Sequence, residues 1–411
     1  MSKQSTKATL VAPAAIELFA GAGGLGMGIS KAGFKSLGVF ERDRYCCDTI
    51  RENQQSNHPI VSLWPLEPGD VKVADFKRFE GKIDLVSGGP PCQPFSLGGK
   101  HKGRKDARDL WPEAVRAVRE ARPRAFIFEN VKGLTREAFA TYFQYIVLQL
   151  SYPEIMRREK DGEKWDEHLS RLEQHHTSRR SNRGLSYRVV FRVLNAANYG
   201  VPQKRERVFF VGFRNDISAE WHFPEPTHSL DALLREQIQT GVYWERHRVP
   251  RAQRAISDRA RARGQQLSLL PDDDTRPWLT IRDAIHDMPA PTIHGSNRYL
   301  NHRLQLGARS YPGHTGSPID EPSKTLKAGV HGVPGGENTV LFPDGKFRYL
   351  SVRESARLQK FPDDFVFHGS WSETMRQLGN AVPVALAHII ASSVREHLAL
   401  STGGNIGRLA V

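Results

Sequence analysis

The stretch Ile16-Glu-Leu-Phe-Ala-Gly-Ala-Gly-Gly-Leu-Gly26 decides the fold of this 411-residue chain. It predicts a short apolar strand that enters a glycine loop, followed by a helix over about residues 25–31. The loop fits the pattern G-x-G-x-x-G with Gly21, Gly23 and Gly26, and Glu41 ends the next apolar run. Glycines let the backbone approach a ligand, and a carboxylate at this spacing binds ribose hydroxyls. The pattern predicts a nucleoside site, although a glycine loop alone is often only a tight turn.

The overall composition indicates a basic globular protein. The formal net charge is +14, which favours a polyanionic partner such as nucleic acid, although a merely solvated basic surface is the alternative. The three cysteines, Cys46, Cys47 and Cys92, are too few for a disulfide framework. The first residues lack the apolar core of a secretory signal, and no apolar run reaches the roughly 18 residues that span a bilayer. We therefore expect a soluble protein of the cytoplasm.

A second stretch, Asp84-Leu-Val-Ser-Gly-Gly-Pro-Pro-Cys92-Gln-Pro-Phe-Ser96, places a cysteine in a proline-rich turn after a short apolar strand. Prolines restrict the backbone, so the thiol is held on a stiff loop at the strand's end, where open α/β sheets present groups to a ligand. A buried structural cysteine is the alternative. The strand predicted over 124–131 carries Glu129 to the same edge, where burial of a carboxyl is costly unless it is solvated, paired or used.

Two arginines mark the start of another buried strand. Gln203, Arg205 and Arg207 alternate directly before the apolar run 208–213, so their side chains are expected on one face. Guanidiniums at this position imply an anionic or carbonyl-bearing ligand. The glycine-rich, basic segment 98–109 suits a mobile lid over a phosphate backbone, or is a plain solvated loop.

The remaining segments carry less chemistry. Residues 151–184 are interpreted as a solvated insertion, because its two adjacent histidines lack partners at metal-ligand spacing. Residues 241–264 are arginine-rich and 295–336 are rich in Gly, Pro and His, which suits nucleic-acid recognition or an unstructured connector. Ser351 and Glu354 predict a capping box for a helix over 350–359. A last helix is predicted to open at Gln377 and to run to about Leu398.

Several stretches, in this order, resemble motifs of one family, the DNA (cytosine-5) methyltransferases. They are residues 19–26 with Glu41 and Asp70-Val71, then 90–96, 129–131, 203–207, 353–359 and 379–382. The resemblance covers residues 16–395, apart from the variable region that the family uses for target recognition. It implies S-adenosyl-L-methionine as cofactor and no metal. The implied cofactor contacts are Phe19, Gly21, Gly23, Gly24, Leu25, Glu41, Asp70, Val71, Pro90, Asn380 and Val382.

The residue types also suit methyl transfer to cytosine C5, which is a poor nucleophile. Addition of the Cys92 thiolate to C6 would make C5 enamine-like, and a Glu129 carboxyl of raised pKa would assist at N3. Arg207 is expected to donate to the base O2, and Arg205 to hold the thiolate or a backbone phosphate. The resemblance implies further DNA contacts from Gln93, Ser96 and Gln203. Because C5 chemistry is blocked in a stacked duplex, the base must flip out.

These inferences predict a doubly wound, Rossmann-like α/β methyltransferase domain over residues 1–214, completed by 372–411. A smaller, irregular target-recognition domain over 215–371 should face it across a basic cleft. The expected partner is double-stranded DNA, bound by a monomer, with a restriction endonuclease as a functional counterpart.

Three other functions compete with this prediction. A nicotinamide dehydrogenase would use the same glycine loop but gives no role to Cys92, Glu129 and the paired arginines together. An RNA cytosine methyltransferase would share the catalytic core, but the large basic region between residues 213 and 350 and Ser96 in the cysteine motif favour DNA. A non-enzymatic binding protein would not need to keep all of these catalytic groups.

Overall fold

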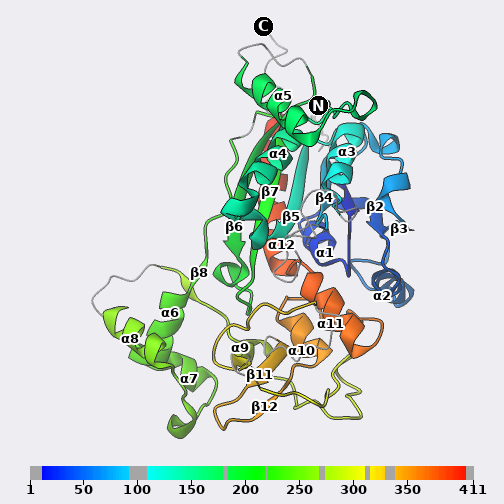
Figure 1. The fold of residues 1–411 in the computed structure, drawn as a ribbon. Coiled ribbons are helices and arrows are strands. Elements are labelled where there is room, and N and C mark those ends of the chain that lie inside the picture. The colour runs from blue at the N-terminus through cyan, green and yellow to red at the C-terminus, as the bar shows by residue number, and fades with distance from the viewer. Residues whose placement is uncertain are drawn as a thin grey trace, which may run out of the picture.

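A mixed seven-stranded sheet forms the centre of the molecule's larger part, and short helices and strands lie below it (Figure 1). The computed structural model describes residues 12–91, 109–178, 184–218, 220–267, 274–310, 315–328 and 338–403. The strand order is β3-β2-β1-β4-β5-β7-β6, in which the first five strands are parallel and β7 is antiparallel to both neighbours. The chain reverses its winding between β1 and β4, and ligands bind at such switch points. The predicted α/β fold is confirmed.

The strands of this sheet are β1 (Ala14–Leu18), β2 (Lys35–Glu41), β3 (Leu66–Pro68), β4 (Leu85–Gly88), β5 (Ala125–Val131), β6 (Tyr187–Asn195) and β7 (Glu206–Arg214). The helices of the same part are α1 (Gly24–Lys31), α2 (Arg44–Gln55), α3 (Trp111–Ala121), α4 (Ala140–Ser151), α5 (Trp165–Thr177) and α12 (Val384–Gly403). Each predicted strand and helix before residue 214 is found within a few residues of its expected bounds.

Alternate side chains of the strands pack into two hydrophobic cores, one on each face of the sheet. Along β5, Phe126 and Phe128 pack towards α3 and α4, whereas Ala125 and Ile127 pack towards α1 and α12. This period of two is the geometry of a strand, and helices on both faces explain why β5 is apolar throughout. β5 is therefore buried on both sides, and its carboxyl end is open to a ligand.

The lower part is built from short elements. They are β8 (His228–Ser229), α6 (Leu230–Leu234), a π-helical segment η7 (Arg235–Thr240), α7 (Val242–Arg246), α8 (Asp258–Leu267), β9 (Arg276–Pro277), α9 (Ile281–Ile285), β10 (Ser317–Pro318), β11 (Thr339–Leu341), β12 (Phe347–Tyr349), α10 (Val352–Arg357) and α11 (Trp371–Asn380). The arginine-rich stretch 241–264 is thus more helical than expected. The capping box of α10 is confirmed, because Ser351 and Glu354 bond reciprocally.

The two parts share buried residues. Ile217, Trp221 and Phe223 pack with α12, and a third core joins Met27 and Ile50 to Ile319 and Leu350. The division at residue 214 stays a prediction.

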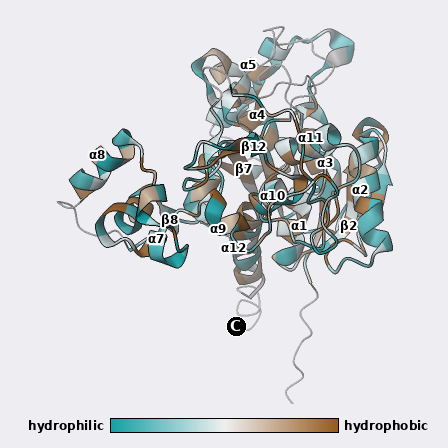
Figure 2. Ribbon diagram, turned by 90° about the horizontal axis from the view of Figure 1, so that it is seen from below, coloured by the Kyte–Doolittle hydropathy of each residue, from teal (hydrophilic) through white to brown (hydrophobic). Residues whose placement is uncertain are grey.

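The single helix predicted from Gln377 was wrong. The chain forms α11 up to Asn380, a short extended link, and then α12 from Val384. Pro383 explains the break, because it has no N–H to donate and its ring disfavours helical geometry at the residue before it. The stretch 371–401 has the length and composition of a membrane span, but 67% of its apolar window is buried inside the protein. In Figure 2, α12 is largely apolar in colour, as expected for a core helix.

Candidate active site

The glycine loop and Glu41 form one bonded unit. Phe19 and Gly21 both have left-handed backbone conformations, with φ of 56°, and Gly23 has φ of 85° as the N-cap of α1. The Glu41 carboxylate, at the end of β2, accepts hydrogen bonds from the backbone N–H groups of Gly21, at 2.6 Å, and of Arg42 and Asp43. The acid predicted for a ribose therefore also fixes the turn beside which a ribose would lie.

A cavity of about 510 Å³ opens at this edge of the sheet, between the ends of β1, β2, β4 and β5 and the link between α11 and α12. Of the predicted cofactor residues, its lining includes Phe19, Gly21, Gly24, Leu25, Glu41, Asp70, Val71, Pro90, Asn380 and Val382. Gly23 does not line the cavity. It packs against Trp64 instead, and an added Cβ would come within 2.7 Å of the Trp64 ring. Gly23 thus supports the turn from behind, where only a glycine fits.

The loop and the C-terminal link approach each other closely. A Cβ at Gly24 would lie 2.3 Å from the Val382 carbonyl oxygen, so the glycine lets the link form one wall of the cavity. Arg376 of α11 also holds this wall in place, since its guanidinium bonds Asp43 at 2.8 Å. The predicted return of Asn380 to the glycine loop is therefore seen in the structure.

The sequence prediction missed several lining residues: Glu17, Arg42, Asp43, Cys46, Arg376 and Gln377. Glu17 is the most unusual, because it is buried inside β1. One of its oxygens accepts from the Gly26 N–H at 2.9 Å, and the other has no hydrogen-bond partner among the described residues. Burial raises the pKa of Glu17 to about 8. The sequence offered one signal for Glu17, namely a carboxyl residue within an otherwise apolar strand.

Glu129 and Arg207 meet in the same cavity. Arg207 Nε lies 2.8 Å from Glu129 Oε1, and both side chains are largely buried, at 13% and 8% exposure. Both residues line the cavity. Burial raises the pKa of the Glu129 carboxyl, although the guanidiniums of Arg207 and Arg205 oppose the shift. The site thus holds a buried carboxyl whose pKa lies above its usual value, beside a donor of hydrogen bonds.

Arg205 and Gln203 are placed differently from the prediction that groups them with Arg207. Arg205 is fully buried, and its guanidinium donates to the Gly379 carbonyl at 2.8 Å. Burial, with the positive charge of Arg207, lowers its pKa well below the ordinary value. Gln203 is also fully buried and forms a backbone bridge with Ser323. Neither residue lines the cavity, so both support it from behind.

The start of the cysteine loop is anchored to the site. Asn130, next to Glu129, donates from its side-chain amide to the Pro90 carbonyl at 2.9 Å. Gly89, Pro90 and Pro91 line the cavity. Cys92, Gln93, Ser96 and the basic segment up to residue 108 lie outside the described residues. The last described residue before Cys92 is therefore at the cavity that contains Glu129.

The lining fits a nucleoside with a charged amino-acid tail. A side chain added at Gly21 would meet nothing within 4 Å, so the turn leaves open space on its cavity side. Phe19 and Val71 offer apolar contact, and the carboxylates of Glu41 and Asp70 accept hydrogen bonds. Apolar surface and carboxylate acceptors of this kind fit the adenine and ribose of a nucleoside.

Comparisons with known proteins agree with this geometry. The family model of the C-5 cytosine-specific DNA methylases matches residues 14–152 and 170–396. The Type II methyltransferase M.PspPI of Psychrobacter sp. (strain TA137) is 32% identical over 386 residues, which cover 92% of this chain and 78% of the relative. M.Eco47II of Escherichia coli is 32% identical over 389 residues, with the same coverage. The solved structure of S. pombe Dnmt2 methyltransferase, 17% identical, shares the fold with a TM-score of 0.55 over 94% of this chain and 99% of that one.

Proposed function

Because this chain belongs to the C-5 cytosine-specific DNA methylases, we propose that it transfers a methyl group from S-adenosyl-L-methionine to C5 of a specific cytosine in double-stranded DNA, through a covalent bond between Cys92 and C6. Its relatives are Type II methyltransferases of restriction-modification systems. The observation that carries the proposal is the shared cavity, in which the Glu129–Arg207 pair faces the glycine loop and Glu41.

The residues of the site suit the first proton transfer of this reaction, and solvent takes the C5 proton that is released in the last step. The Cys92 thiolate adds to C6, and the electron pair displaced from the C5–C6 double bond is stabilised by protonation at N3. Glu129 is the group for N3, because it lies in the cavity beside Arg207 and burial raises the pKa of its carboxyl, which favours its action as an acid. Arg207 donates to the O2 carbonyl while its Nε stays with Glu129. After C5 gains the methyl group, it loses its proton and the thiolate leaves from C6.

The chain's own residues would hold the cofactor at the glycine loop. Glu41 would bind the ribose, Asp70 and Val71 the adenine, and Asn380 with Val382 the amino-acid part. When bound, S-adenosyl-L-methionine supplies an electrophilic methyl group. Arg205, which bonds the Gly379 carbonyl next to Asn380, would link the base site to this wall rather than contact a phosphate. Gln93 and Ser96 remain proposed contacts of the DNA. Gln203, which is fully buried, is proposed to support the base site from behind.

The setting follows from the substrate. An enzyme that methylates chromosomal DNA would work in the bacterial cytoplasm or nucleoid, as a monomer on duplex DNA, alongside an endonuclease that cuts the same unmethylated sequence. The net charge of +14 suits this polyanion.

The test uses duplex DNA in which 5-fluorocytosine replaces cytosine. Fluorine at C5 cannot leave as a proton does, so the thiolate is not eliminated and the adduct survives denaturation. We expect the adduct with wild-type protein and S-adenosyl-L-methionine, and none with Cys92→Ser. The matched control is Cys47→Ser, which removes a buried thiol of α2 that does not line the cavity. An adduct that forms only on tRNA, or that survives Cys92→Ser, contradicts the proposal.

A further inference from the structure

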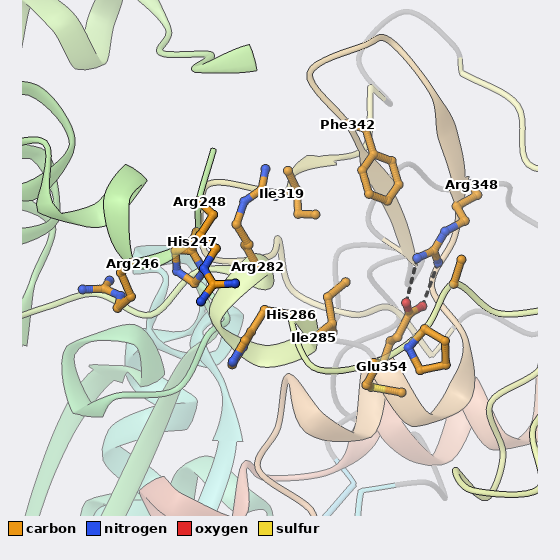
Figure 3. Close-up of a pocket in the computed structure, with 13 residues that line it drawn as sticks. Arg246, His247, Arg248, Arg282, Ile285, His286, Ile319, Phe342, Arg348 and Glu354 are labelled. Atoms are coloured by element: carbon orange, nitrogen blue, oxygen red, sulfur yellow. Dashed lines mark hydrogen bonds and ion pairs between the residues drawn. The ribbon is translucent and has the colours of Figure 1, made fainter. Parts of the chain in front are cut away.

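A second cavity, of about 550 Å³, lies in the lower part of the molecule, well apart in sequence from the glycine loop (Figure 3). We call it the recognition cavity. Its apolar lining consists of Ile285, Met288, Pro289, Ala290, Ile319 and Phe342, and its polar lining of Arg246, His247, Arg248, Arg282, His286, Arg348 and Glu354. Figure 3 shows Arg246, His247, Arg248 and Arg282 on one side and Phe342 with the Arg348–Glu354 pair on the other. Its size is that of a ligand site.

Most of the arginines of this cavity are already paired. Arg282 bonds Asp320 at 2.6 Å, Arg348 bonds Glu354 through both nitrogens at 2.7 Å, and Arg246 bonds Glu236 at 2.9 Å. Arg248 differs. It is exposed, and no carboxylate of the described residues lies within ion-pair distance of it. Its positive charge is therefore available to a ligand.

The backbone of Arg248 gives a second, independent signal. Arg248 N–H bonds the Glu245 carbonyl and Val249 N–H bonds the Trp244 carbonyl, which is the Schellman pattern that ends α7. This pattern puts Arg248 at the position where glycine is favoured, and its φ is 52°. Val249 and Trp244 pack together in one small core, so the motif is complete. An arginine in a glycine position is strained, and such strain concentrates at functional sites.

A second arginine with a left-handed backbone conformation, Arg122, has ion pairs that explain its position. Arg122, with φ of 50°, ends α3. Its guanidinium bonds Glu154 at 2.6 Å and approaches Glu80 at 3.5 Å. The ion pairs account for an arginine at that position. Arg248 has the same backbone conformation without such partners, so its side chain is expected to act on something outside the chain.

We propose that the recognition cavity binds a nucleotide of the substrate DNA, with Arg248 as the contact to its phosphate. The inference rests on the proposed function, because the phosphate belongs to the duplex that is methylated. The apolar floor of Ile285, Met288 and Phe342 suits the sugar or base edge, and the paired arginines beside it hold fixed positions. A guanidinium and a phosphate form two parallel hydrogen bonds, which a lysine cannot match.

The decisive variant is Arg248→Gly, because glycine relieves the strained backbone and removes only the guanidinium. We expect the melting temperature to be unchanged or raised. Affinity for duplex DNA, measured by fluorescence anisotropy, should fall roughly tenfold, and the slope of log affinity against log salt should shrink by about 0.9. Loss of affinity without loss of stability separates a binding role from a structural one.

The charge control is Arg251→Ala, which removes an exposed arginine three residues away that does not line the cavity. An equal loss of affinity in both variants would mean a general charge effect and overturn the assignment. The same follows if Arg248→Gly binds duplex DNA like the wild type. If instead a free deoxynucleoside monophosphate raises the melting temperature of the wild type but not of Arg248→Gly, while duplex affinity is equal, the site takes free nucleotides. Failure of the wild type to bind any duplex would overturn the proposed function itself.

Discussion

Buried charged side chains differ in their pairing between two regions of this protein. One region is the sheet edge around Glu17, Glu129 and Arg205, which we call the catalytic edge, and the other is the lower part. At the edge, Arg205 Nε and Nη1 and one oxygen of Glu17 are buried without hydrogen-bond partners among the described residues. In the lower part, Asp320 accepts from both Arg282 and Tyr243, and Glu354 accepts two bonds from Arg348. Buried charged groups at the edge thus keep unpaired atoms, whereas these two buried carboxylates of the lower part are paired with arginines.

The difference follows from what each region must do. Unpartnered buried groups cost stability, so they persist where a ligand or a reaction uses them. Closed ion pairs do not bind anything else, but they hold a chain that has few long elements. Substitutions of the two kinds should therefore act in opposite directions, the first on activity and the second on stability.

The largest effect is expected from Glu129→Gln. Loss of the acid at N3 should lower kcat by about 10²- to 10⁴-fold, measured by tritiated methyl transfer to duplex DNA. Stability should change little, because glutamine has the shape of glutamate and its amide oxygen can still lie beside Arg207. The wild-type kcat/KM should fall as pH rises through the raised pKa of Glu129, whereas the variant should lack that decline.

A clear loss of stability in Glu129→Gln would break the comparison, because the carboxylate would then be holding the fold. Asn130→Asp is unsuitable as a control, since Asn130 anchors Pro90. Glu206→Gln is better matched: it removes a neighbouring carboxylate that pairs with Lys132 on the exposed side of β7. Its kcat should stay within about twofold of the wild type, because surface pairs contribute little.

The second prediction concerns Asp320→Ala in the lower part. Asp320 is 4% exposed, and its loss removes the carboxylate that pairs with the Arg282 guanidinium, while the Tyr243 hydroxyl keeps only its bond with Thr280. The free energy of unfolding should fall by about 3–5 kcal/mol in urea titrations, as when one partner of a buried pair is removed. Asp344→Ala, which breaks the exposed pair with Lys346, should leave the free energy of unfolding nearly unchanged. Equal losses of stability in the two variants would mean that the buried pair of Asp320 contributes no more to stability than an exposed pair.

The same contrast explains what was predictable from the sequence. The strands and helices up to residue 214 follow from apolar runs, glycines and strand-end carboxylates, which are local signals. Glu129 was found because a carboxyl that ends an apolar run is costly to bury unless it is used, and Glu41 was found by its spacing from the glycine loop. Long-range packing was harder: the roles of Arg376 and Gln377 depend on how α11 returns to β2, and no local pattern encodes that contact.

Two expectations were changed by contacts between distant parts of the chain. Gln203, Arg205 and Arg207 alternate as expected with the more exposed Lys204 and Glu206. Only Arg207 lines the cavity, however, because the Arg205 guanidinium bonds the Gly379 carbonyl and buried Gln203 bridges to Ser323. The short helices α7 and α8 lie in an arginine-rich stretch whose apolar anchors, Tyr243 and Trp244, belong to a small core assembled from distant residues. Tertiary contacts outweighed local pattern in both cases.

The smallest of the three effects is expected from Glu17→Gln, and it depends on pH. The ordinary pKa of the side chain is 4.5, and burial raises it to about 8 in the folded protein. Between these values the unfolded chain loses the proton while the folded chain keeps it, so wild-type stability should fall as pH rises from about 5 to 8. The neutral glutamine escapes this fall and still accepts from the Gly26 N–H through its amide oxygen. The free energy of unfolding of the variant should match that of the wild type at pH 5 and exceed it by about 2–4 kcal/mol at pH 9.

The control is Glu220→Gln, which changes an exposed carboxylate and should show no such divergence from the wild type. Unfolding curves that stay parallel from pH 5 to 9 would show that Glu17 is ionised in the fold, and that the catalytic edge does not store an unpaired acid.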